Sequence, residues 1–143
     1  MTSTETEVAV LFADVVGSTR LYELLGDNRA RELIQLCVEV MRGATVRNRG
    51  TVIKTIGDEI LAIFPTVDDA VNAGGEMQQD IGARPELLVQ GQHVAIRIGC
   101  HFGPVLLENK DIFGASVHTA NRMTSQAKAG QIILSADSVR RCS

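Results

Sequence analysis

Blocks of apolar and polar positions along the chain predict both strands and helices. The continuous apolar run from Val8 to Ala13 ends at Asp14 and is typical of a buried strand. From about Asn28 to Arg47 the apolar residues recur at helical spacing, which predicts a long amphipathic helix. The same reasoning predicts a helix that begins near Arg20 after Gly17-Ser18-Thr19, a hairpin of Thr51 to Ile56 and Ile60 to Phe64 around Gly57-Asp58-Glu59, and a further helix capped by Thr66.

The second half of the chain predicts strands on either side of one more helix. Val94 to Phe102 alternates apolar and polar residues, the pattern of a strand with one buried face. Gly103-Pro104 is expected to turn the chain into a second short strand, Val105 to Glu108. The other elements expected here are a loop from Gly82 to Gln92, a helix from about Ala115 to Lys128 closed by Gly130, a strand from Gln131 to Leu134 and a short terminal helix.

The order of these elements favours a single α+β domain that spans residues 1–143. Strands and helices interleave around a central hairpin, which is typical of a ferredoxin-like, palm-like sheet with helices packed on it. The chain contains no internal repeat, low-complexity tract or interdomain linker, and its length is that of one ordinary domain.

Composition narrows the classes of partner. A net charge of -3 provides no basic face for nucleic acid, and one Tyr and four Phe are too few for a base-stacking platform. The three cysteines form no CxxC pair, so neither zinc nor a disulfide framework is indicated. No apolar run approaches the ~20 residues of a membrane span, and the polar start lacks a secretory signal. We therefore expect no nucleic acid, no membrane segment and a cytoplasmic location.

Two acidic residues lie at the ends of predicted strands. Asp14 ends the first strand and Asp58 lies at the tip of the hairpin. If the first strand lies beside the hairpin, the two carboxylates converge and can hold hard divalent cations such as Mg²⁺. Taken alone, Asp58 is explained equally well as a turn residue, because Asp is favoured in turns.

The residues after Asp14, Val15 to Thr19, lie at a strand-to-helix junction. Backbone N–H groups at such a junction bind anions with help from the helix dipole. The chain has no GxxxxGK[ST] motif, so it is not a P-loop nucleotidase. Without Asp14 beside it, Gly17-Ser18-Thr19 indicates only the start of a helix.

Four motifs, in order along almost the whole chain, resemble the signature blocks of class III adenylyl and guanylyl cyclase catalytic domains. They are Phe12-Ala13-Asp14-Val15-Val16-Gly17-Ser18-Thr19, Lys54-Thr55-Ile56-Gly57-Asp58-Glu59, Arg97-Ile98-Gly99-Cys100-His101-Phe102-Gly103, and Asp111-Ile112-Phe113-Gly114 through Ala120-Asn121-Arg122-Met123. Any one of them is a weak signal, whereas four in the order of the family are a strong one.

The resemblance implies a nucleotide site with two divalent cations, Mg²⁺ or Mn²⁺. Asp14 and Asp58 would bind the metals, with the Val15 carbonyl as a further ligand. The backbone of Val16, Gly17, Ser18 and Thr19 would hold the terminal phosphates, and Arg97 would reach the same triphosphate. From its strand position alone, Arg97 is better explained as part of a solvated face.

The resemblance also implies how the base and the ribose are recognised. Lys54 would donate to adenine N1 and Asp111 would accept from the N6 amine, so ATP is favoured over GTP. Arg122 matches an arginine that stabilises charge on the α-phosphate, and His118 lies four residues before it on the same helix face. The family usually has Asn where this chain has His118, so a bulkier ring would orient the ribose.

The expected reaction is closure of ATP to cyclic AMP and pyrophosphate, at sites shared in an antiparallel homodimer. Each site would combine Asp14, Asp58 and Arg97 of one chain with the base- and ribose-binding residues of the other. Family domains continue with a strand or hairpin that supplies another phosphate-binding lysine, whereas this sequence ends at Ser143, so the domain is either cut short or lacks that element.

Three alternatives stay open at this point. His118 and the early end favour a degenerate cyclase domain that binds nucleotide or dimerises without turnover. A guanylate cyclase differs in its base-recognising residues. A diguanylate cyclase is remote, because Ile56-Gly57-Asp58-Glu59-Ile60 lacks the first Gly and the Phe of the expected Gly-Gly-Asp-Glu-Phe hairpin.

Overall fold

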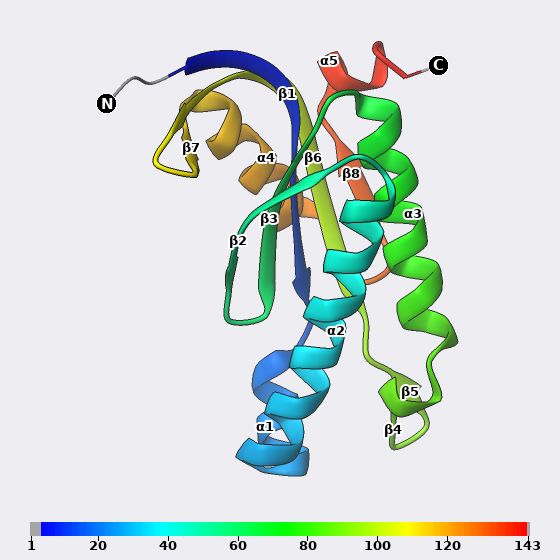
Figure 1. Ribbon diagram of the computed structural model, residues 1–143. Helices are drawn as coiled ribbons and strands as arrows, with labels where there is room; N and C mark the ends of the chain where they lie inside the picture. Colours follow the sequence, from blue (N-terminus) through cyan, green and yellow to red (C-terminus); the bar gives the residue numbers. More distant parts are fainter. Residues whose placement is uncertain (1–3, 143) are drawn as a thin grey trace.

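The computed structural model describes residues 4–142 and has an antiparallel sheet with helices on both faces (Figure 1). The elements run β1 (Thr4–Val15), α1 (Ser18–Leu25), α2 (Asp27–Arg47), β2 (Thr51–Ile56), β3 (Glu59–Phe64), α3 (Val67–Ala83), η1 (Pro85–Leu87), β4 (Leu88–Val89), β5 (Gln92–His93), β6 (Ile96–Glu108), β7 (Asp111–Phe113), α4 (Ala115–Gln126), β8 (Ile132–Leu134) and α5 (Ala136–Val139). The main sheet has the order β2-β3-β1-β6-β7, and β8 pairs with β6 in parallel. The α+β class and the interleaved order predicted from the sequence are confirmed.

Alternation along β1 divides the core into two layers. Ala9, Leu11 and Ala13 face α2 and α3, which lie side by side over one face of the sheet (Figure 1). Val10 and Phe12 face the opposite way and pack in a second cluster, to which α4 contributes Ala120. Because successive side chains of a strand point to opposite faces, Asp14 falls on the same face as Val10 and Phe12.

Strand β6 corrects two expectations. It runs without a break from Ile96 to Glu108, so Gly103-Pro104 does not turn the chain. Pro104 is paired with β1 on one side, while β8 pairs only as far as Cys100 and β7 starts pairing at Leu106. The missing N–H of the proline is tolerated there because the second edge of the strand is open at that point.

The turn occurs instead at Asn109 and Lys110, both of which have positive φ angles, 53° and 61°. Two such residues between paired strands are the pattern of a tight hairpin loop. Glu108 and Asp111 close this loop as register partners, so β7 folds back along β6.

The polar face of β6 is also covered, which corrects the expectation of a strand with one buried face. A Cβ on Gly99 would lie 2.0 Å from the backbone nitrogen of Thr124, and one on Gly103 would lie 2.3 Å from Ser116 Oγ. The two glycines therefore allow α4 to pack directly on the backbone of β6.

Helix α3 and the segment after it agree with the sequence prediction in one detail and differ from it in another. The Thr66 hydroxyl accepts a hydrogen bond from the Asp69 backbone N–H (3.1 Å), which confirms the predicted cap of α3. The loop expected between Gly82 and Gln92 holds the end of α3, the turn η1 and part of a two-stranded hairpin.

Cys37 and Cys100 are free and buried, and burial raises the pKa of each thiol to about 12. Between residues 4 and 142, no helix is both long and apolar enough to span a membrane.

Candidate active site

Three charged side chains meet across neighbouring strands near the end of β1. Asp14 is the register partner of Glu59 on β3 and of Arg97 on β6. Residues directly opposite each other in an antiparallel ladder point to the same face, so all three lie on the α4 side of the sheet. The sequence predicts that Asp14 ends a strand, that Glu59 lies in a hairpin turn and that Arg97 lies within a strand, but it does not give this register.

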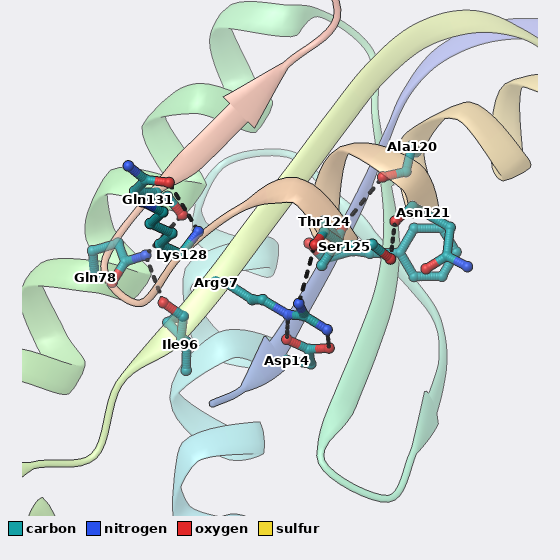
Figure 2. Close-up of polar contacts among 11 residues, drawn as sticks. Asp14, Gln78, Ile96, Arg97, Ala120, Asn121, Thr124, Ser125, Lys128 and Gln131 are labelled. Carbon is teal, nitrogen blue, oxygen red and sulfur yellow. Dashed lines mark hydrogen bonds and ion pairs between the residues drawn. The ribbon is translucent and has the colours of Figure 1, made fainter. Parts of the chain in front are cut away.

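Arg97 binds the Asp14 carboxylate with two hydrogen bonds (Figure 2). Nε lies 2.8 Å from Oδ1 and Nη2 lies 3.3 Å from Oδ2, and Nη1 donates to the Ser125 carbonyl at 3.4 Å. Both side chains are partly buried, and the hydrogen bonds to Asp14 raise the pKa of the guanidinium. The resemblance implies that Arg97 contacts the triphosphate. In this structure Arg97 instead binds Asp14, a carboxylate that is expected to bind metal.

The hairpin between β2 and β3 brings Asp58 to the same strand end. The Asp58 carbonyl accepts a hydrogen bond from the Val15 backbone N–H at 3.2 Å. Burial raises the pKa of the neighbouring Glu59, and the negative charges of Asp14 and Asp58 raise it further, against opposing effects of nearby cations. Glu59, which the sequence analysis did not assign a role, is thus close enough to both aspartates to respond to their charge.

These oxygen donors suit a magnesium site. Among residues 4–142 no three His, Cys, Asp or Glu side chains are already arranged around one metal position. Mg²⁺ needs no such protein cage, because it commonly uses one or two carboxylates together with substrate phosphates. Asp14 and Asp58, from adjacent strand ends tied by the Val15 hydrogen bond, supply that number. The residues present therefore fit the predicted cation site in type and number.

The turn after β1 contains the backbone amides predicted to bind phosphate. The Val16 backbone N–H is donated to the Ala95 carbonyl at 2.8 Å, so this amide already has a partner. Gly17 adopts a left-handed conformation (φ 72°) and α1 starts at Ser18 without a side-chain cap. The first-turn amides of an uncapped helix face outward. The backbone donors that suit an anion thus begin after Val16.

Two hollows flank this turn. One, of about 450 Å³, lies between α1, α2 and the hairpin tip, and its lining includes Ser18, Thr55 and Asp58. The other, of about 300 Å³, is lined by Val15 to Gly17, Arg97 and residues 127–129. Asp58 and Ser18 therefore line one hollow, and Gly17 and Arg97, which binds Asp14, line the other.

Lys54 and Asp111 are in direct contact although they lie on the two outer strands of the sheet. Lys54 Nζ lies 3.0 Å from Asp111 Oδ2, and the other carboxylate oxygen accepts from the Ile112 backbone N–H at 2.8 Å. The hydrogen bond from Lys54 contributes most to lowering the pKa of Asp111. β1 and β6 curve together so that β7 lies on the same side of the molecule as β2 (Figure 1). The fold thus brings together the two residues predicted to bind the base.

His118 and Arg122 lie on the outer side of α4. Both side chains are exposed, whereas Ser116, Ala120 and Thr124 of the same helix are buried against the sheet. Arg122 reaches Thr119 Oγ at 3.5 Å, and within residues 4–142 neither side chain pairs with the carboxylates of Asp14 or Asp58. The predicted site residues are therefore divided between separate parts of one chain.

The chain belongs to the family described as the adenylate and guanylate cyclase catalytic domain, because the model of that family matches residues 1–143. This confirms the resemblance carried by the four motifs.

Relatives and solved structures include cyclases of both specificities. The putative adenylate cyclase 3 of Rhizobium meliloti is 30% identical over 127 residues, which are 89% of this chain and 22% of that relative. The catalytic core of a rhodopsin-guanylyl cyclase with converted specificity, in complex with ATPαS, is 27% identical with a TM-score of 0.85, covering 98% of this chain and 83% of that one. The adenylyl cyclase CyaB from P. aeruginosa shares the fold with a TM-score of 0.89 at 24% identity, over 98% and 82% of the two chains.

Proposed function

We propose that this domain is an adenylate cyclase that converts ATP to 3′,5′-cyclic AMP and pyrophosphate at the interface of a cytoplasmic homodimer. The observation that carries the choice of ATP is the contact between Lys54 and Asp111. The lysine offers a hydrogen-bond donor and the carboxylate an acceptor, side by side. Adenine presents the matching acceptor N1 and donor N6, whereas guanine presents N1–H and O6 in the opposite sense.

The acidic strand ends provide the cation site. Asp14, Asp58 and the Val15 carbonyl would hold two divalent ions, Mg²⁺ or Mn²⁺, which when bound lower the pKa of an attacking hydroxyl and neutralise phosphate charge. Asp14 would exchange its hydrogen bonds with Arg97 for a cation, and Arg97 would then be available to the triphosphate. The amides of Gly17, Ser18 and Thr19 would bind the terminal phosphates.

In the reaction, the ribose 3′-hydroxyl would give its proton to Asp14 or to water, its oxygen attacks the α-phosphorus in line, and the bond to the pyrophosphate oxygen breaks. Arg122 would stabilise the charge on the α-phosphate, a contribution worth ~3–4 kcal/mol for one well-placed donor. His118 would orient the ribose through one ring N–H. Lys54 and Asp111 would hold the base so that the 3′-hydroxyl stays in line.

Exposure of the second group of residues supports a shared site. His118 and Arg122 point away from their own sheet, and large apolar side chains, Ile56 and Phe113, are exposed on the strands that carry Lys54 and Asp111. Exposed apolar residues beside functional ones are typical of interfaces between proteins. In an antiparallel pair, the base- and ribose-binding residues of one chain would meet Asp14 and Asp58 of the other.

A product assay tests the proposal and the role of His118. With either Mg²⁺ or Mn²⁺, we expect the cyclic AMP formed from ATP to exceed the cyclic GMP formed from GTP by at least about tenfold. His118→Asn is expected to raise kcat by several-fold, because the smaller amide fits the ribose with less crowding. Binding of ATP without either product would instead support a degenerate, nucleotide-binding domain.

A mixing experiment tests the shared site. Asp14→Ala and Lys54→Ala are each expected to be inactive. An equal mixture of the two is expected to recover up to about a quarter of wild-type activity, because about half of the dimers are mixed and each of these contains one intact site out of two. Mixed-dimer formation is measured with two affinity tags. A mixed dimer that forms but has no activity would exclude sites shared in this way.

A further inference from the structure

The segment between α4 and β8 brings a lysine to the turn that follows β1. Lys128 lines the 300 Å³ hollow together with Val15, Val16, Gly17 and the side of Arg97. The hollow is therefore bounded by Gly17, the residue directly before α1, and by two basic residues.

The backbone of Lys128 is held in place by several hydrogen bonds. Its N–H donates to Gln131 Oε1 at 2.8 Å, and its carbonyl accepts from the Gln131 N–H at 3.0 Å. Gly130 N–H donates to the Ile96 carbonyl at 2.9 Å, which attaches the turn to β6. Gln78 of α3 donates from Nε2 to the carbonyls of Ile96 and Gln131 (Figure 2). The position of Lys128 relative to β6 is thus fixed, and only its side chain is free to adjust.

The side chain of Lys128 differs from that of Arg97 in having no acidic partner in the part of the chain that the structure describes. Arg97 is bound to Asp14, whereas Lys128 is exposed and forms no ion pair among residues 4–142. An unpaired lysine on most surfaces is simply solvated. Here it borders a hollow that is also lined by Gly17, directly before the first residue of α1, and a flexible ammonium near a helix start suits a phosphate oxygen.

We propose that Lys128 binds the terminal phosphates of the nucleotide from within the same chain that supplies Asp14. This inference rests on the proposed function for the identity of the anion. It assigns a second phosphate-binding cation to this chain, a role for which the sequence analysis found no residue. Arg97 and Lys128 would then hold the triphosphate from two walls of one hollow.

The test compares Lys128→Gln with Lys110→Gln, a matched change at an exposed lysine in the β6–β7 turn. The probe is inorganic tripolyphosphate with Mg²⁺, measured by calorimetry, followed by the KM and kcat for ATP. We expect Lys128→Gln to weaken tripolyphosphate binding and raise KM about tenfold with kcat within about twofold, since a hydrogen bond to a charged group is lost. Lys110→Gln should change neither, and Lys128→Arg should restore most of the affinity.

The outcomes separate this inference from the proposed function. Weaker tripolyphosphate binding in Lys128→Gln supports the site even when the wild-type chain makes no cyclic AMP, a result that would overturn only the proposed activity. Equal binding by wild type and Lys128→Gln, or no binding by wild type, would overturn the role of Lys128. Thermal unfolding midpoints of the three variants establish that each is folded.

Discussion

Asp14→Asn is expected to lower kcat/KM for ATP by at least about a hundredfold, because the amide keeps the shape of the carboxylate but removes the charge that attracts a divalent cation. The amide also cannot replace the paired acceptors that Arg97 uses now. Asp58→Asn is expected to have a similar effect. Activity is measured as cyclic AMP formed at saturating Mn²⁺ over a range of ATP concentrations.

The control for this result is Asp69→Asn. Asp69 also pairs with an arginine, Arg49 at 2.6 Å, but on α3 and away from the strand ends that carry Asp14 and Asp58. Its replacement should leave activity within about twofold, since this pair is far from the proposed site and its arginine is largely exposed, so that the pair contributes little to stability. If Asp14→Asn retained wild-type activity while folded, metal binding at the end of β1 would be excluded.

Exchanging the charges of Lys54 and Asp111, the pair proposed to bind the base, is expected to reverse nucleotide preference. In the double variant Lys54→Glu with Asp111→Lys, the acceptor and the donor change places while an ion pair is retained, so the site matches N1–H and O6 of guanine. We expect the ratio of kcat/KM for GTP over ATP to rise about a hundredfold or more, because unmatched buried donors and acceptors are costly. The measurement is the rate with each nucleotide separately.

The single variants are the controls for this exchange. Lys54→Glu places two carboxylates in contact and Asp111→Lys places two ammonium groups in contact, so each should lose activity with both nucleotides. We expect the double variant to recover activity and to prefer GTP, because the two substitutions compensate for each other. A double variant that still prefers ATP would show that Lys54 and Asp111 do not recognise the base.

The strand ends could be read from the sequence because local signals define them. The apolar run before Asp14 and the turn around Asp58 predict where β1 and the hairpin end, and the structure agrees with both. The register is not local. Glu59 lies opposite Asp14 only because of how β1 and β3 align. For the same reason, the pairing of Arg97 with Asp14 was not predicted.

The long-range pairing and curvature of the strands explain the other differences between prediction and structure. The residues Gly103-Pro104 have turn-forming character, but β6 continues through them because β1 pairs with it along the whole length. The contact between Lys54 and Asp111 was expected only from the resemblance, since β2 and β7 occupy opposite edges of the strand order. Their meeting depends on the joint curve of β1 and β6, which no local pattern encodes.

The close packing of α4 on Gly99 affects the position of Arg122. A side chain at this position would push outward on the backbone at Thr124, and Arg122 is only two residues away on the same helix. The distance between Arg122 and the sheet therefore depends on Gly99 having no side chain. Under the proposed role of Arg122, a substitution at Gly99 would therefore alter turnover although Gly99 packs under α4 and is not itself one of the proposed nucleotide-binding residues.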